Sequence, residues 1–168
     1  GGTINAANVD IGGAATSALT ISGGTASFNF DGTSSIVQAA GGLTLNVANH
    51  NTGTLAFAGL INAISGAGMQ FNNADGIYNF PGITTLNGGN AGNDIYNGAT
   101  GTFTFGTAAS LTHNGAGNAF VLLSSANVTF DGSITDNDGT AVEIDGHDAG
   151  TATFNGTMSS SIGNARTV

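Results

Sequence analysis

The sequence lacks cysteine and tryptophan, and it contains a single proline among 168 residues. The absence of cysteine excludes disulfides, thiol catalysis and cysteine-based zinc sites. A proline removes one backbone donor from a β-ladder, so its near absence is typical of a chain built from repeated ladders. These absences already favour an all-β structure that owes its stability to packing and backbone hydrogen bonds.

Basic residues are also nearly absent. Arg166 is the only lysine or arginine, against ten acidic residues, and the formal net charge is −9. A nucleic-acid surface needs several cations to neutralise phosphates, and an anionic membrane attracts basic segments. The composition therefore argues against both partners. No apolar run approaches the roughly 20 residues that a membrane helix needs, so we expect no membrane insertion within this segment.

Glycine and phenylalanine are prominent in the sequence. It has 29 glycines and ten phenylalanines, and 40% of its residues are hydrophobic. A weakly charged, glycine-rich chain can be disordered, but disordered chains are poor in aromatic residues. Here the aromatic residues recur at ordered positions, which predicts a thin, evenly distributed core.

The aromatic residues mark an internal repeat. The motif Phe-x-Gly begins at five phenylalanines, and a degenerate copy, Phe105-Gly106-Thr107, lies between the third and the fourth. The six anchors are Phe30, Phe57, Phe80, Phe105, Phe130 and Phe154. Successive anchors lie 23 to 27 residues apart. A period of this length indicates a solenoid in which each repeat is one structural unit.

Each repeat reads as two or three short strands. Apolar residues stand two positions before each anchor, and mostly small polar residues stand one position before it, which is the period of a strand with one buried face. A second apolar pair follows in most repeats: Leu43/Leu45, Met69/Phe71, Phe120/Leu122 and Val142/Ile144. Single apolar residues between them suggest a third strand: Ile61, Ile134 and Met158. Glycine and asparagine fill the joints, where positive φ is tolerated.

The fold class that follows is all-β: a parallel β-solenoid, specifically a right-handed β-helix of about six to seven coils with roughly 25 residues per coil. We expect one domain over residues 1–168, a segment of a larger repetitive protein, with residues 1–23 forming an irregular first coil. The six anchor phenylalanines should stack as one internal ladder. At about 4.8 Å per coil the rod would be roughly 30 Å long.

The run from Gly101 to Ser161 is similar to the β-strand-repeat regions of large bacterial surface proteins. The matching text is Gly-Thr-Phe-Thr-Phe, Asn-Val-Thr-Phe-Asp-Gly-Ser-Ile-Thr, Gly-Thr-Ala-Val-Glu-Ile and Gly-Thr-Ala-Thr-Phe-Asn-Gly-Thr-Met. Such regions occur in autotransporter passengers, filamentous-haemagglutinin-like adhesins and giant secreted repeat proteins. The resemblance implies a secreted or cell-surface stalk, adhesin or filament, and it brings no catalytic motif with it.

The termini bear on assembly. A solenoid leaves unpaired ladder groups at each end, and natural solenoids cap them. Neither end of this sequence shows an amphipathic helix or a charged cap. We expect either a truncated segment or subunits that stack head to tail into a filament.

Six of the ten acidic residues lie within 18 positions. They are Asp131, Asp136, Asp138, Glu143, Asp145 and Asp148. Carboxylates are the ligands that Ca²⁺ prefers, so Asp131, Asp136, Asp138, Glu143 and Asp145 are candidate calcium ligands. Asp136-Asn137-Asp138-Gly139 resembles the start of a calcium loop, but its glycine comes at the fourth position and no glutamate stands at the twelfth. The competing interpretation is turn residues and solubilising charge. We expect no cofactor other than this possible calcium.

Paired carboxylates also suggest glycoside hydrolysis, for which Asp136, Asp138 and Asp145 are the candidates. Sites acting on acidic sugars usually add basic residues, and this chain offers only Arg166 at its extreme end, so we expect no enzyme. A carbohydrate-binding or carbohydrate-active β-helix remains an alternative function. His50, His113 and His147 lie in three different repeats without metal-ligand spacing, and we expect exposed turn residues.

Threonines form a second regular feature. Thr102, Thr104, Thr129, Thr151 and Thr153 should point outward and form a flat array over three coils. Such arrays order water in several ice-binding proteins, which makes ice binding a further alternative. Threonine is also simply a favourable residue on an exposed strand.

The leading hypothesis is therefore a structural or adhesive extracellular module, a β-helical shaft or filament segment. Its expected partners are copies of itself, head to tail or side by side, with a carbohydrate or a host or cell surface as the alternative partner.

Overall fold

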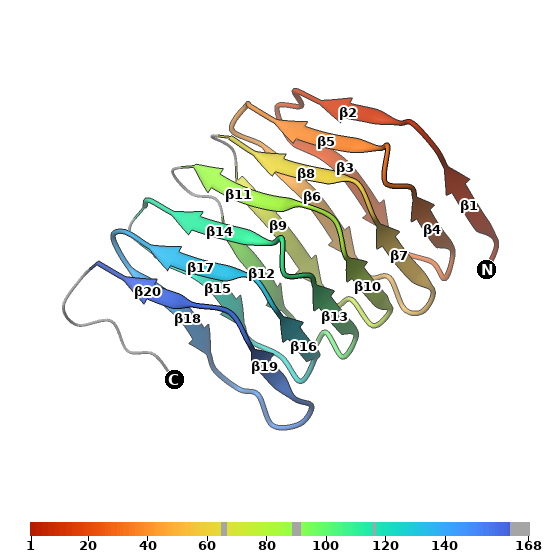
Figure 1. Cartoon of the computed structure of the whole chain (residues 1–168). Coiled ribbons are helices and arrows are strands. Elements are labelled where there is room, and N and C mark those ends of the chain that lie inside the picture. Colours follow the sequence, from red (N-terminus) through yellow and green to blue (C-terminus); the bar gives the residue numbers. More distant parts are fainter. Residues whose placement is uncertain (65–66, 89–91, 116, 162–168) are drawn as a thin grey trace.

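The computed structural model describes residues 1–64, 67–88, 92–115 and 117–161. Within these ranges the chain is all-β and holds three parallel sheets of seven, seven and six strands, here called sheets A, B and C. The coils stack along one axis, from the red N-terminal coil to the blue C-terminal one (Figure 1). The predicted solenoid is confirmed; its right-handed winding stays a prediction. None of the described residues belongs to a helix capable of spanning a membrane.

Each coil contributes one strand to each sheet in turn. Sheet A holds β1 (Thr3–Ala6), β4 (Ser27–Phe30), β7 (Thr54–Phe57), β10 (Ile77–Phe80), β13 (Thr102–Phe105), β16 (Asn127–Phe130) and β19 (Ala152–Phe154). Sheet B holds β2 (Asp10–Gly12), β5 (Ser35–Gln38), β8 (Leu60–Ala63), β11 (Thr84–Gly88), β14 (Ser110–His113), β17 (Ser133–Asp136) and β20 (Met158–Ser160). Sheet C holds β3 (Ser17–Ser22), β6 (Leu43–Ala48), β9 (Ala67–Asn72), β12 (Asn93–Tyr96), β15 (Asn118–Leu122) and β18 (Thr140–Ile144).

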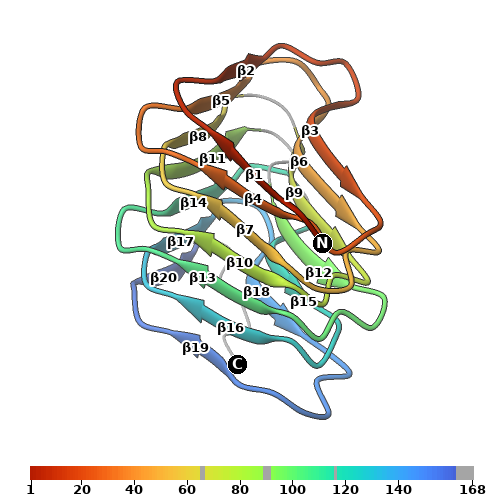
Figure 2. The same cartoon turned by 90° about the vertical axis from the view of Figure 1, so that its right-hand side faces the viewer.

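Strand order within each sheet follows coil order without interruption. Figure 2 shows this for sheet A, whose strands lie across the front from β1 to β19. Six coils supply all three strands, and a seventh supplies β19 and β20. Residues 1–23 form the first of these coils, with β1, β2 and β3 each paired to the next coil. The third strand suggested by the isolated apolar residues corresponds to sheet B.

Alternation along sheet A places the anchor phenylalanines inside. Paired registers join Phe30 to Phe57, and Phe80 to Phe105, Phe130 and Phe154 in succession. The Phe80 and Phe105 rings stack with centroids 5.0 Å apart, and the Phe105 and Phe130 rings lie 5.2 Å apart. The predicted ladder is confirmed in two runs, Phe30–Phe57 and Phe80–Phe105–Phe130–Phe154. The first coil has Ala6 at the anchor position, so aromatic burial accumulates along the axis from the second coil onward.

Sheet C corrects one detail of the sequence prediction. The inward pair in the second coil is Leu45/Val47, because Leu45 pairs with Met69 and Val47 with Phe71. The predicted pair Leu43/Leu45 was wrong by two residues, a shift that preserves the alternation and is therefore invisible to it. In the fourth coil the inward ladder position is taken by Asn93, between Met69 and Phe120.

The corner from sheet C to sheet A repeats an asparagine in the left-handed region. Asn49, Asn73 and Asn97 have φ of 55°, 50° and 54°. Their side chains link coils, since Asn73 Nδ2 donates to Asn49 Oδ1 at 3.0 Å. Asparagine tolerates this conformation better than other non-glycine residues, which explains its abundance at the joints.

Candidate functional site

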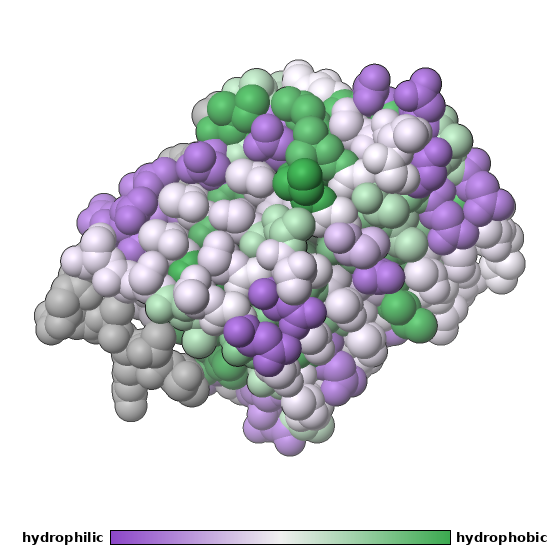
Figure 3. Space-filling model, in the orientation of Figure 1, coloured by the Kyte–Doolittle hydropathy of each residue, from purple (hydrophilic) through white to green (hydrophobic). Residues whose placement is uncertain are grey.

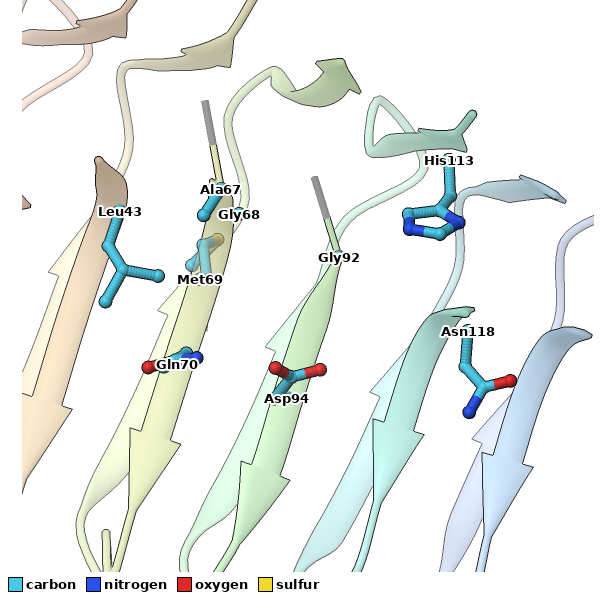
Figure 4. Close-up of a pocket in the computed structure, with 9 residues that line it drawn as sticks. All are labelled: Leu43, Ala67, Gly68, Met69, Gln70, Gly92, Asp94, His113 and Asn118. Carbon is cyan, nitrogen blue, oxygen red and sulfur yellow. The ribbon is translucent and has the colours of Figure 1, made fainter. Parts of the chain in front are cut away.

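A small polar pocket lies at the corner between sheets B and C. Its volume is about 70 Å³. It is lined by Leu43, Ala67, Gly68, Met69, Gln70, Gly92, Asp94, His113 and Asn118. Figure 4 shows Gln70 and Asp94 on neighbouring strands of sheet C, with His113 entering from β14 and Asn118 on the next strand. Four strands from two sheets thus bring an amide, a carboxylate, an imidazole and a second amide together.

His113 is held by a carboxylate from the next coil. Its Nδ1 lies 3.1 Å from Asp136 Oδ2, and both side chains are buried. The other carboxylate oxygen, Oδ1, accepts a hydrogen bond from the backbone N–H of Asp138 at 2.9 Å. The two residues are paired in the β14–β17 register. An imidazole fixed through Nδ1 keeps a defined orientation beside the pocket.

Asp94 is the carboxylate of the pocket itself. Burial raises the pKa of its carboxyl above the ordinary value, while a hydrogen bond from Gln70 and the nearby His113 lower that pKa and the Glu143 carboxylate raises it. Glu143 stands in the same outward column, two strands away, because both residues pair with Val121. Asn118 Nδ2 donates to Glu143 Oε2. The pocket therefore carries negative charge in a partly desolvated place.

A second, more open hollow lies beside the pocket on the outer face of sheet C. Its volume is about 210 Å³, and its lining is Gln70, Asp94, Tyr96, Val121 and Leu123. Gln70 and Asp94 line both hollows. Leu123 is 41% exposed. The outer face of sheet C thus combines an apolar floor with a polar, acidic end, and we call the two hollows together the sheet C groove.

Replacing Asp94 by asparagine should stabilise the chain at neutral pH. Because burial raises the pKa of Asp94 in the folded state, folding favours its protonated form, and stability falls as pH rises through that pKa. Asparagine preserves the shape and removes the charge. We expect a melting temperature roughly 1–3 °C higher at pH 7, and no gain near pH 3, where the aspartate is protonated in both states.

The measurement is thermal unfolding by circular dichroism at several pH values. Asp148→Asn is the matched control, because it removes an exposed carboxylate outside the groove. An Asp94→Asn gain that persists at pH 3, or that Asp148→Asn reproduces, would contradict the role of desolvation.

The structure separates the candidate calcium ligands. Asp131 follows β16, where Asn155 Nδ2 donates to its Oδ1, whereas Asp136 faces the interior of sheet B and Glu143 faces outward on sheet C. Asp138 and Asp145 are exposed at the two ends of β18. Among the residues that the structure describes, no three histidine, aspartate or glutamate side chains are grouped to hold a metal ion.

The threonine array has the predicted outward placement. Thr104, Thr129 and Thr153 follow one another in register on sheet A, and Thr102 stands in the neighbouring column opposite Asn127. Thr151 Nα donates to Asn127 Oδ1 at 3.1 Å. Towards the N-terminal coils the array is interrupted by Ile77, which is 54% exposed.

A second hydroxyl array was not foreseen. On the outer face of sheet B, one column holds Thr85, Ser110 and Ser133, and the next holds Asn87, Thr112, Thr135 and Ser159. Figure 3 shows the visible face largely in pale colours of intermediate hydropathy, with a compact green patch near the top. Small hydroxyl side chains therefore line parts of two of the three faces.

The expectation of exposed turn histidines was wrong, since even His147 is half-buried and its Nδ1 lies 2.6 Å from the Ser124 carbonyl oxygen. His50 and His113 are both buried. His50 Nδ1 lies 2.9 Å from the Tyr78 hydroxyl, and His50 Nε2 lies 2.8 Å from the Ala26 carbonyl oxygen. Burial raises the pKa of Tyr78 to about 12. These contacts join three coils at one corner, so His50 completes the core there.

Sequence reasoning missed Gln70, Asp94 and Tyr96. The signal existed, because they occupy the outward positions beside the inward pairs Met69/Phe71 and Asn93/Ile95. The polar Asn93 hid that repeat from a search for apolar pairs. In the same way, His113 follows the inward Leu111 by two residues, which predicts an inward side chain.

The chain was compared with protein-family models, curated proteins and solved structures, and none of the three comparisons gives a match.

Proposed function

We propose that this chain is a rigid structural segment of a shaft or filament on a secreted or surface-exposed protein. The observation that carries the proposal is the unbroken parallel order of all three sheets through the coils. Each inner coil is hydrogen-bonded to its neighbours through all three sheets, which makes such a stack stiff along its axis.

Composition and sequence resemblance support an extracellular setting. The faces are rich in small hydroxyl side chains and poor in charge, and the text from Gly101 to Ser161 is similar to β-strand-repeat regions of bacterial adhesins and stalks. Such faces suit the close lateral packing of rods, since few charges have to be desolvated.

Within the segment given by this sequence, the first coil presents an edge on which another coil can stack. Strands β1, β2 and β3 each stand at the margin of their sheet. Ile4 lies on the inward side of β1, opposite Phe28, and is 53% exposed. An open edge with an uncovered apolar side chain is a template for pairing with another strand. A second copy would supply that strand and extend the stack.

This proposal predicts concentration-dependent assembly. We expect sedimentation velocity to show species whose size grows with protein concentration. Electron microscopy should show rods whose diameter equals the cross-section of a single coil. The matched variant is Thr3→Pro. The carbonyls of Gly2 and Ala6 accept hydrogen bonds from the N–H groups of Ser27 and Asp31. Backbone groups alternate in direction along a strand, so Thr3 turns its N–H toward the open edge, and proline there blocks pairing without removing an internal bond.

Thr3→Pro should keep the β-sheet circular dichroism spectrum and shift the assembly to higher concentration by about tenfold or more. A chain that stays monomeric at every concentration would contradict head-to-tail stacking. Assembly that Thr3→Pro leaves unchanged would place the contact elsewhere than the first coil.

A further inference from the structure

The sheet C groove has the form of a site for part of an extended ligand. Its two hollows, about 70 Å³ and about 210 Å³, share Gln70 and Asp94 in their linings. Sites that enclose a whole small molecule usually measure about 300–1,000 Å³. A shallow groove running across neighbouring strands instead suits one or two units of a chain that continues over the surface.

The lining divides by chemistry along the groove. Tyr96, Val121 and Leu123 present an aromatic ring and two aliphatic side chains on adjacent strands, as the Asp94–Val121 register requires. Gln70 and Asp94 present hydrogen-bonding groups at the other end. A pyranose ring matches this pattern, because its C–H face packs on apolar surface while its edge substituents form hydrogen bonds.

The charge of the groove selects among sugars. Asp94 and Glu143 occupy one outward column, and Asp145 follows β18 on the same sheet. The only arginine or lysine in the whole sequence is Arg166. An anionic saccharide would meet uncompensated repulsion here, whereas an ammonium group would gain Coulomb energy at a partly desolvated carboxylate.

We propose that the sheet C groove binds an amine-bearing saccharide, with a pyranose ring lying on Tyr96, Val121 and Leu123 and its ammonium group at Asp94. Gln70 holds the carboxylate in place through its hydrogen bond. This inference is independent of the shaft role, because the groove lies on the outer face of a sheet and leaves both end coils free.

The direct test is calorimetric titration of the intact chain with the trisaccharide of glucosamine and, separately, with its fully N-acetylated form. The two ligands share a backbone and differ in charge. We expect the charged trisaccharide to bind at least about tenfold more tightly, and its affinity to fall as salt is raised. Equal affinity for the two would overturn the role of the amine, and no binding of either would overturn the site.

Variants locate the contact. Asp94→Asn should weaken the charged trisaccharide about tenfold or more and bring its affinity close to that of the N-acetylated one, and Tyr96→Ala should weaken both. Asp10→Asn, on the outer face of sheet B, is the control and should change neither. Unfolding curves of each variant establish that the fold is retained. Binding that survives both groove variants would overturn the assignment.

The pH profile gives a readout that a structural role would not produce. Once the ligand amines are fully protonated, a further fall in pH through the raised pKa of Asp94 should weaken binding, and Asp94→Asn should abolish this component. The other titratable groups facing Asp94 are His113 from β14, Glu143 from β18 and Tyr96 on its own strand. A profile that Asp94→Asn leaves unaltered would contradict the ammonium–carboxylate contact.

Discussion

Phe105→Ala should lower the free energy of unfolding by about 3–5 kcal/mol, as expected for loss of a fully buried aromatic side chain. The Phe105 ring lies between those of Phe80 and Phe130, with centroids 5.0 and 5.2 Å away, and meets Phe120 edge-on at 6.4 Å. No neighbouring side chain can fill the cavity left by the Phe105 ring without leaving its own packed position in the ladder. Urea denaturation followed by circular dichroism measures the change.

The control for this prediction is the same substitution in the last coil. Phe154 has the same place in the repeat but is only half-buried, because no coil follows it in the described structure. We expect Phe154→Ala to cost clearly less than Phe105→Ala. Equal costs would mean that burial of the ring between two coils contributes nothing beyond its local packing.

Gly132→Ala should destabilise the chain by about 3 kcal/mol or more. A Cβ at position 132 would lie 2.0 Å from the carbonyl oxygen of Ala109, a backbone atom of the preceding coil. To relieve that overlap the two coils must separate at the corner, where Ser133 N donates to Ala109 O at 3.0 Å. Losses of this size arise when the backbone itself has to move.

Two glycines provide matched controls. Gly32 belongs to the same Phe-x-Gly motif, but its added Cβ would meet nothing closer than the Ala58 carbonyl oxygen at 3.9 Å, and a Cβ on Gly41 would meet nothing within 4 Å. Alanine at either position should be neutral or stabilising by up to about 1 kcal/mol. A large loss for Gly32→Ala would show that the motif glycine is needed for its conformation and not for the close approach.

The motif explains how much of the fold the sequence could predict. Phenylalanine is required because its ring fills one rung of the ladder, and glycine because the corner that follows brings two backbones into contact. Where four residues separate the strands, as in 31–34 and 106–109, the corner has more room. Gly32 keeps the motif there without a close backbone contact, and at 106–109 the motif loosens into Gly106-Thr107. The regular spacing of phenylalanine and glycine therefore predicted the length of a coil. Contacts between neighbouring coils require each of these two residue types at its position.

The groove was harder to predict for a physical reason. Corners differ in length, so residues that face one another across coils are 23 to 27 positions apart in sheet A, and only the register identifies a column. Asp94, Val121 and Glu143 form such a column from three unlike residues. This column has no residue type that recurs from coil to coil. A core ladder does, because each coil offers the same buried space to its inward side chain.

The pairing of each coil only with its neighbours has a consequence for how such proteins change. A unit of about 24 residues can be duplicated or deleted in the gene and still find the same two surfaces above and below it. The number of coils, and with it the length of the molecule, can then change during evolution while the cross-section stays constant. A face that recognises a ligand can be confined to a few units without limiting how far the rest extends.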